Sequence, residues 1–146
     1  MGNISTFSAV IIFLKTHLQA VMETLQLIIS KKDYDILKDH LKLSTNLSEF
    51  NKQKLEQELN AAQVLDEEDL PKDVVKLESF VTIESVVNKK TFTFQLVMPG
   101  EANMKKQKLS VFAPIGIALL GYRTGTDVEW EMPNGLQKFK IVEVKN

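Results

Sequence analysis

The chain has 146 residues, of which 44% are hydrophobic and 25% charged, the ordinary range for a globular protein with a real core. Its 18 basic residues balance 19 acidic ones, so the formal charge of −1 gives no general attraction to nucleic acid, and no direct sequence-specific nucleic-acid partner is expected. There is no cysteine, which excludes a disulfide framework, a thiol nucleophile and thiolate metal sites and fits a reducing cytoplasm.

Residues 1–29 are interpreted as an N-terminal tail. Its apolar run, residues 9–14, is too short to span a bilayer and no basic residue precedes it, so neither a signal peptide nor a membrane partner is expected. Gly2 and Thr6 match the myristoylation pattern, which is short and often accidental. Met22 is interpreted as the natural translation start, which would place residues 1–21 outside the native protein.

Two amphipathic helices are predicted next. Ser30 followed by Asp33 approximates a capping box, and the helix that it opens ends near Leu43. A second helix begins at Glu49. The apolar faces of the two helices consist of Tyr34, Leu37 and Leu41 and of Leu55, Leu59 and Ala62. A short polar break between them predicts an antiparallel helical hairpin over residues 30–65, about 18–24 Å long.

An acidic linker, residues 66–76, follows, and Pro71 ends the helical pattern. Its four consecutive acids, residues 66–69, are interpreted as solvated or capping residues. The alternative, a hard-cation site, lacks the glycine and Asp/Asn spacing of a calcium loop, so no metal is expected.

In residues 77–146 the apolar period changes from 3.6 to 2, which predicts a small, mostly antiparallel sheet of about five strands and an α+β fold class. The expected strands lie near residues 81–83, 91–98, 109–112, 127–132 and 138–144. Asn134 and Gly135 suit positive φ in a hairpin turn. A charge-free helix opened by Pro114 and closed by Gly121 in a left-handed conformation is expected to cover one face of the sheet.

Catalytic motifs are absent from the sequence. The two histidines, His17 and His40, lie in the tail and on the first helix, and no zinc-protease, nucleophile-elbow, Walker or dinucleotide-binding motif occurs. The lysine pairs in residues 88–92 and 104–108 are interpreted as solvated loop tips, with an acidic partner as the alternative. No enzyme activity, cofactor or catalytic residue is therefore predicted.

The segment LSVFAPIGIALLGYRTGTDVEWEMPNG, residues 109–135, resembles the C-terminal domain of the Gre transcription elongation factors. The alanine before the proline and the Trp-Glu beside the hairpin are more similar to the branch called regulator of nucleoside diphosphate kinase. The segment LNAAQVLDEEDLPKDVV, residues 59–75, is similar to the helix end and linker of the same branch, and the resemblance extends over residues 25–145.

The resemblance implies an FKBP-like C-terminal domain and bacterial RNA polymerase as the partner. In Gre factors this domain docks on a coiled coil at the rim of the polymerase secondary channel, and DNA is engaged only indirectly. The corresponding candidate polymerase-binding residues are Phe112, Ala113, Pro114, Ile115 and Gly116. Ile117, Leu119 and Leu120 would be core residues. The alternative is that the whole stretch is core and cap.

The hairpin tip departs from the Gre pattern. Gre factors stimulate transcript cleavage by carrying acidic residues on a long coiled coil to a catalytic magnesium. Here the tip, residues 43–50, offers Asn46, Ser48 and Glu49 as candidates, and Glu49 is its one acid. A single carboxylate on a short arm does not deliver a magnesium ligand to that depth.

The function predicted is therefore a non-catalytic, cytoplasmic transcription regulator that binds polymerase near the secondary channel without stimulating cleavage. Two alternatives remain open. One is a residual enzyme role, either cleavage stimulation through Glu49 or slow prolyl isomerisation. The other is an interaction module for another protein.

Overall fold

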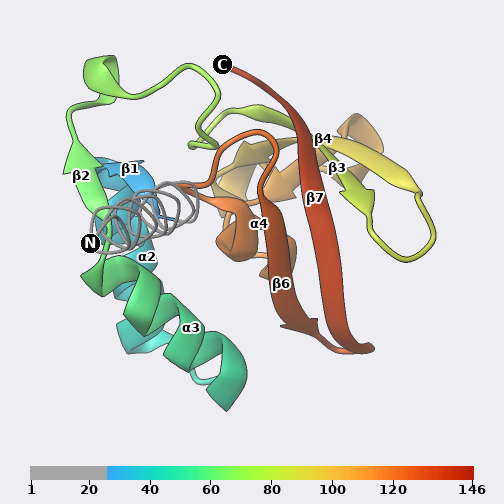
Figure 1. The fold of residues 1–146 in the computed structure, drawn as a ribbon, viewed down its shortest axis with the longest axis horizontal. Coiled ribbons are helices and arrows are strands. Elements are labelled where there is room, and N and C mark those ends of the chain that lie inside the picture. Colours follow the sequence, from blue (N-terminus) through green and yellow to red (C-terminus); the bar gives the residue numbers. More distant parts are fainter. Residues whose placement is uncertain (1–25) are drawn as a thin grey trace, which may run out of the picture.

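The computed structural model describes residues 26–146, which form an α+β fold with two helices beside a five-stranded sheet (Figure 1). Residues 1–25 of the proposed tail, which include Gly2, Thr6, His17 and the proposed start at Met22, lie outside the described residues. Within residues 26–146, no helix is long and apolar enough to cross a membrane.

The helices α2, Lys31–Leu43, and α3, Glu49–Asn60, occupy the two segments that the sequence indicated as helical. Each begins at a serine whose hydroxyl accepts a hydrogen bond from the backbone N–H three residues on, Ser30 from Asp33 and Ser48 from Asn51, both at 3.1 Å. Leu37 and Leu55 are buried between the helices and the rest of the core. We call α2, α3 and their connection, residues 31–60, the arm.

Two short strands that the sequence did not indicate join the base of the arm. β1, Ile28–Ser30, pairs in parallel with β2, Gln63–Leu65. The interpretation of residues 1–29 as a tail therefore does not describe their last residues, because Leu27 and Ile29 are buried in the core. Strands of three residues are too short to show a clear alternation of apolar and polar residues, and these two are separated in sequence by two helices. The sequence therefore did not predict this pair.

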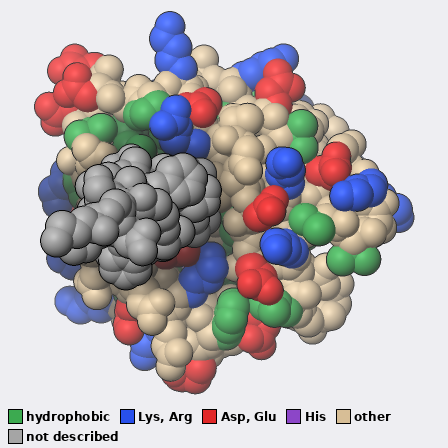
Figure 2. Space-filling view, viewed as in Figure 1, with side chains coloured by type: hydrophobic (Ala, Val, Ile, Leu, Met, Phe, Trp, Pro, Cys, Tyr) green, Lys and Arg blue, Asp and Glu red, His purple; other side chains and the backbone are tan. Residues whose placement is uncertain are grey.

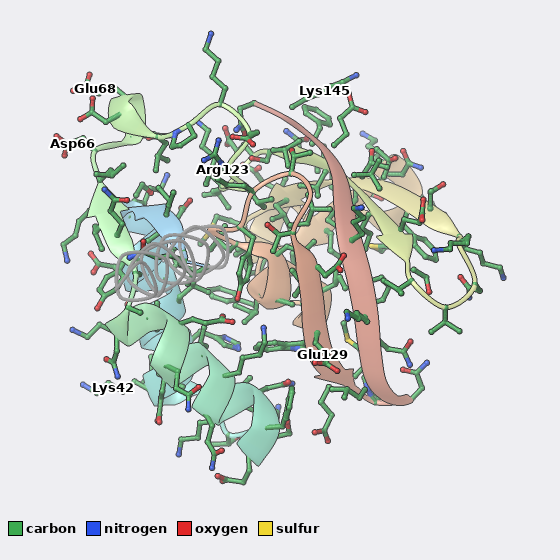
Figure 3. All side chains as sticks on the ribbon, in the orientation of Figure 1. Lys42, Asp66, Glu68, Arg123, Glu129 and Lys145 are labelled. Atoms are coloured by element: carbon green, nitrogen blue, oxygen red, sulfur yellow. The ribbon has the colours of Figure 1, made fainter. Side chains whose placement is uncertain are left out.

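The linker contains a single turn of 3-10 helix, η1, Glu67–Asp69, whose side chains are exposed. Figure 3 shows Asp66 and Glu68 pointing away from the body of the protein. Glu67 pairs with Lys76 at 3.1 Å, and Val74 and Val75 are buried. The linker is thus anchored at its C-terminal end.

The sheet is ordered β5-β4-β3-β7-β6. Its strands are β3 Phe80–Ser85, β4 Thr91–Val97, β5 Lys108–Ser110, β6 Asp127–Met132 and β7 Gly135–Lys145. Two further 3-10 turns, η2 Pro99–Glu101 and η3 Met104–Lys106, lie between β4 and β5. Only the β4–β5 pair is parallel, so the sheet is mostly antiparallel, as predicted. In the β6–β7 turn Gly135 has a φ of 113° and Asn134 does not have positive φ, so that part of the turn prediction was wrong.

The inner face of the sheet meets α4, Pro114–Leu119, which packs against β6 (Figure 1). Ile117, Leu119 and Leu120 are buried, as predicted. Gly121 follows with a φ of 88°, and its carbonyl accepts a hydrogen bond from Ile28 N–H at 3.1 Å. A Cβ at Gly121 would lie 3.0 Å from Leu27, so the end of α4 is packed closely onto the base of the arm.

Candidate functional site

A groove of about 480 Å³ separates the tip of the arm from the sheet domain. The arm contributes polar residues and one leucine to its wall, and the domain contributes aromatic and apolar residues and one glutamate. The arm side consists of His40, Ser44, Asn46, Leu47, Ser48 and Asn51. The domain side consists of Phe112, Pro114, Ile117, Trp130, Glu131, Met132 and Pro133. Two tip candidates, Asn46 and Ser48, and two candidates at the start of α4, Phe112 and Pro114, therefore line the same groove, which the sequence could not show.

The five candidate docking residues differ in accessibility. Phe112 and Pro114 are exposed, and Ala113 and Ile115 are half-buried, so these four form an edge at the start of α4. Gly116 is buried, and a Cβ there would lie 2.7 Å from the carbonyl oxygen of Ser110. The fifth candidate thus has a packing role, because it lets α4 approach the chain that leads into it. We call residues 112–115 the docking edge.

The three tip candidates are also unlike one another. Ser48 caps α3 and is half-buried, whereas Asn46 and Glu49 are exposed. Asn46 and Ser48 line the groove, and Glu49 does not.

Asn51 makes two hydrogen bonds between the arm and the sheet domain. Its side-chain Nδ2 donates to the carbonyl oxygen of Glu131 at 2.8 Å, and its Oδ1 accepts from the Glu131 N–H at 2.9 Å. Asn51 is 4% exposed. The sequence analysis missed this residue, although a signal existed: Asn51 lies four and eight residues before Leu55 and Leu59, so it is a polar residue on the apolar face of α3.

The ring of His40 stacks on the docking edge. Its centroid lies 5.4 Å from that of Phe112, with an interplanar angle of 10°. His40 is half-buried, and burial lowers the pKa of its imidazole, so the neutral ring is favoured. The sequence placed His40 on the helix surface; the stack is a tertiary contact that no local pattern encodes.

Two further contacts tie the arm to the domain at its base. The buried Asp33 carboxylate accepts from the Leu77 N–H at 3.2 Å, and burial raises the pKa of this carboxyl above its usual range. Lys54 lies 3.5 Å from the hydroxyl of buried Tyr122 and pairs with Glu58 at 2.9 Å. Burial, followed by the charge of Glu58, raises the pKa of Tyr122, which stays a neutral phenol.

Side chains of both charge signs lie on the visible surface (Figure 2). In Figure 2, Lys and Arg side chains are interspersed with Asp and Glu over the sheet, and a red cluster marks the η1 region. On the arm, Lys42 points outward from α2 (Figure 3). Among residues 26–146, no three acidic or histidine side chains are grouped closely enough to hold a metal ion.

Comparisons with known proteins show the family. The family "Transcription elongation factor, GreA/GreB, C-term" matches residues 70–146. Transcription elongation factor GreA of Christiangramia forsetii is 37% identical over 112 residues, covering 77% of this chain and 68% of that protein. The regulator of nucleoside diphosphate kinase of Escherichia coli K12 is 38% identical over 82 residues, covering 56% of this chain and 60% of that protein.

A solved structure described as prokaryotic transcription elongation factor GreA/GreB from Nitrosomonas europaea superposes with a TM-score of 0.62 at 33% identity, covering 83% of this chain and 98% of that one. The fold and the matched segment thus define a transcription factor of the elongation-factor class. The chain belongs to the GreA/GreB family, as its resemblance predicted.

Proposed function

We propose that this protein is a non-catalytic transcription regulator that binds bacterial RNA polymerase at the rim of its secondary channel and does not stimulate transcript cleavage. The observation that carries the proposal is the docking edge. Phe112 and Pro114 are exposed beside a groove, on the segment that corresponds to the polymerase-docking loop of Gre factors. An exposed aromatic ring next to a rigid proline supplies area for a protein contact at a low cost in conformational entropy.

The length of the arm argues against a role in cleavage. α2 has 13 residues and α3 has 12, so at 1.5 Å per residue the arm extends about 20 Å. In this proposal the arm is a short antiparallel hairpin, and the sheet domain beside it is FKBP-like. Its tip lies at the groove next to the docking edge, and its one acid is Glu49. A protein anchored by the docking edge would keep this carboxylate close to the anchor, at the channel entrance.

The first test is co-elution of the full chain with bacterial core RNA polymerase, with and without an excess of a Gre factor. Pro114→Glu is the informative variant, because Pro114 is exposed at the first position of α4, where an acid is tolerated by the helix. Pro99→Glu is the matched control, since Pro99 is also exposed at the start of a helical turn and does not line the groove.

We expect wild type and Pro99→Glu to bind and to be displaced by the Gre factor, and Pro114→Glu to lose binding while remaining folded by circular dichroism. If Pro114→Glu and Pro99→Glu bind polymerase equally well, the docking edge is not the polymerase-binding surface. Failure of the wild-type protein to bind at micromolar concentrations would refute polymerase as the partner and favour an interaction module for another protein.

The second test concerns cleavage. A backtracked transcription complex is incubated with the wild-type protein or with Glu49→Ala, and a Gre factor serves as the positive control. We expect neither protein to accelerate cleavage. Acceleration by the wild type that Glu49→Ala abolishes would establish the residual cleavage role instead.

A further inference from the structure

The side chain of Asn51 occupies the free edge of the sheet. β6 is an edge strand, and only its other side pairs, with β7. The N–H and C=O of Glu131 point outward from that edge, and Asn51 satisfies both with one carboxamide. A carboxamide presents a donor and an acceptor side by side, as a neighbouring strand would, so Asn51 continues the β ladder by one residue.

This contact is costly to break because the Asn51 carboxamide is buried. Asn51 is 4% exposed, whereas Glu131 is exposed, so separating the two would leave the carboxamide without its two hydrogen bonds to Glu131. The contact joins residues 80 positions apart in the chain, so it holds the arm to the domain directly. We call it the latch.

The latch lies in the wall of the same groove as the docking edge. His40 lies in the last turn of α2, and its imidazole ring stacks on the ring of Phe112. When Asn51 holds the arm on the domain, the arm therefore also holds His40 against Phe112. If the arm leaves the domain, the stack is lost and Phe112 regains rotamer freedom that a partner must then restrict.

We propose that Asn51 is a positioning residue: through the latch and the His40–Phe112 stack it keeps the docking edge ordered for its partner. The identity of that partner rests on the function proposed above, whereas the coupling between latch and edge is a property of the protein alone. Two sites linked in this way influence each other reciprocally, so binding at the edge also stabilises the docked arm.

The test in the free protein is amide hydrogen exchange of the full chain, followed by NMR for wild type, Asn51→Asp and Gln53→Ala. Asn51→Asp is nearly isosteric and suits the first turn of α3, but it replaces the N–H donor with an oxygen that faces the Glu131 carbonyl. Gln53→Ala removes an exposed amide from the same helix and is the matched control.

In Asn51→Asp we expect about tenfold faster exchange of the Glu131 amide, because the second aspartate oxygen repels the Glu131 carbonyl and so weakens the whole contact, including the bond that this amide donates to Oδ1. We also expect faster exchange of the Phe112 and Ala113 amides, which are 61 and 62 positions away in sequence from Asn51. Helix content by circular dichroism should be unchanged. Gln53→Ala should leave all three amides as in wild type.

A helix-capping role for Asn51 would predict no change at Phe112 and Ala113. Unchanged exchange at these two amides would therefore overturn the coupling, and unchanged exchange at Glu131 would overturn the latch itself.

Polymerase titration provides the second readout. If wild type binds, Asn51→Asp should bind about tenfold more weakly than Gln53→Ala; equal affinities would overturn the effect on docking. If wild type does not bind, the proposed function fails, and the exchange experiment still decides the coupling.

Discussion

Replacement of Gly116 by alanine tests whether the last candidate of the docking stretch serves packing or binding. Gly116 lies inside α4 with a helical conformation, so alanine introduces no φ strain there. A Cβ at this position would lie 2.7 Å from the carbonyl oxygen of Ser110 and 2.9 Å from that of Val111. Both obstacles are backbone atoms, which cannot rotate away as a side chain would. α4 must shift instead.

Two opposing effects set the magnitude. Overpacking a close contact costs about 1–3 kcal/mol, and a rigid backbone obstacle belongs at the upper end of this range. Alanine in place of glycine in a helix returns about 1 kcal/mol. The free energy of unfolding should therefore fall by about 2 kcal/mol. In a chain of this size that corresponds to a melting temperature about 4–8 °C lower.

The measurement is thermal unfolding of Gly116→Ala beside Gly100→Ala. No atom lies within 4 Å of the Cβ position at Gly100, which is exposed, so that variant should melt close to wild type. If the two variants melt together, the crowding argument is wrong. In that case, if Gly116→Ala also loses partner binding, the partner must contact position 116 directly, since α4 would not have been displaced.

Three further predictions concern the attachment of the arm. Asp33→Asn should be at least as stable as wild type at pH 7, because the amide oxygen still accepts from Leu77 N–H without the cost of burying a charge. Asp33→Ala removes this acceptor, so its free energy of unfolding, measured in urea, should be about 1–3 kcal/mol lower than that of wild type. Gly121→Ala should be less stable than Gly125→Ala, although both glycines have a φ near 90°, because only the Cβ at Gly121 meets neighbouring atoms; equal melting temperatures would contradict this. Because burial lowers the pKa of His40, the unfolded state binds the proton first as the pH falls, so the contribution of His40 to stability is present above about pH 6.5 and is lost as the pH falls below it. His40→Phe keeps an aromatic stack without a titrating nitrogen and should show a smaller loss of urea stability between about pH 6.5 and pH 5, and an unchanged loss would exclude His40 as the source.

Features set by neighbouring residues could be predicted from the sequence. The serine cap at Ser30, the two helices of the arm, the alternating strand Asp127–Met132 and the left-handed Gly121 all depend on contacts within a few residues. Membership of the GreA/GreB family was likewise recognisable, because the residues around the α4 segment form a specific combination.

Alternation overstated one strand. Alternation places Phe92, Phe94, Leu96 and Met98 on one side of a strand over residues 91–98, but β4 ends at Val97, and of these four only Phe94 and Leu96 are buried. Periodicity assigns a residue to a face of the sheet. Which part of that face is covered depends on the position of α4 and the arm.

The arrangement of the arm on the sheet was decided by tertiary structure alone. The parallel β1–β2 pair, the Asn51–Glu131 latch and the His40–Phe112 stack each join segments separated by dozens of residues or more. A periodic pattern records which side of a helix or strand is apolar, but it contains no information about which distant backbone group a carboxamide will meet. The groove follows from the same long-range packing, because its wall consists of residues from α4, β6 and the arm.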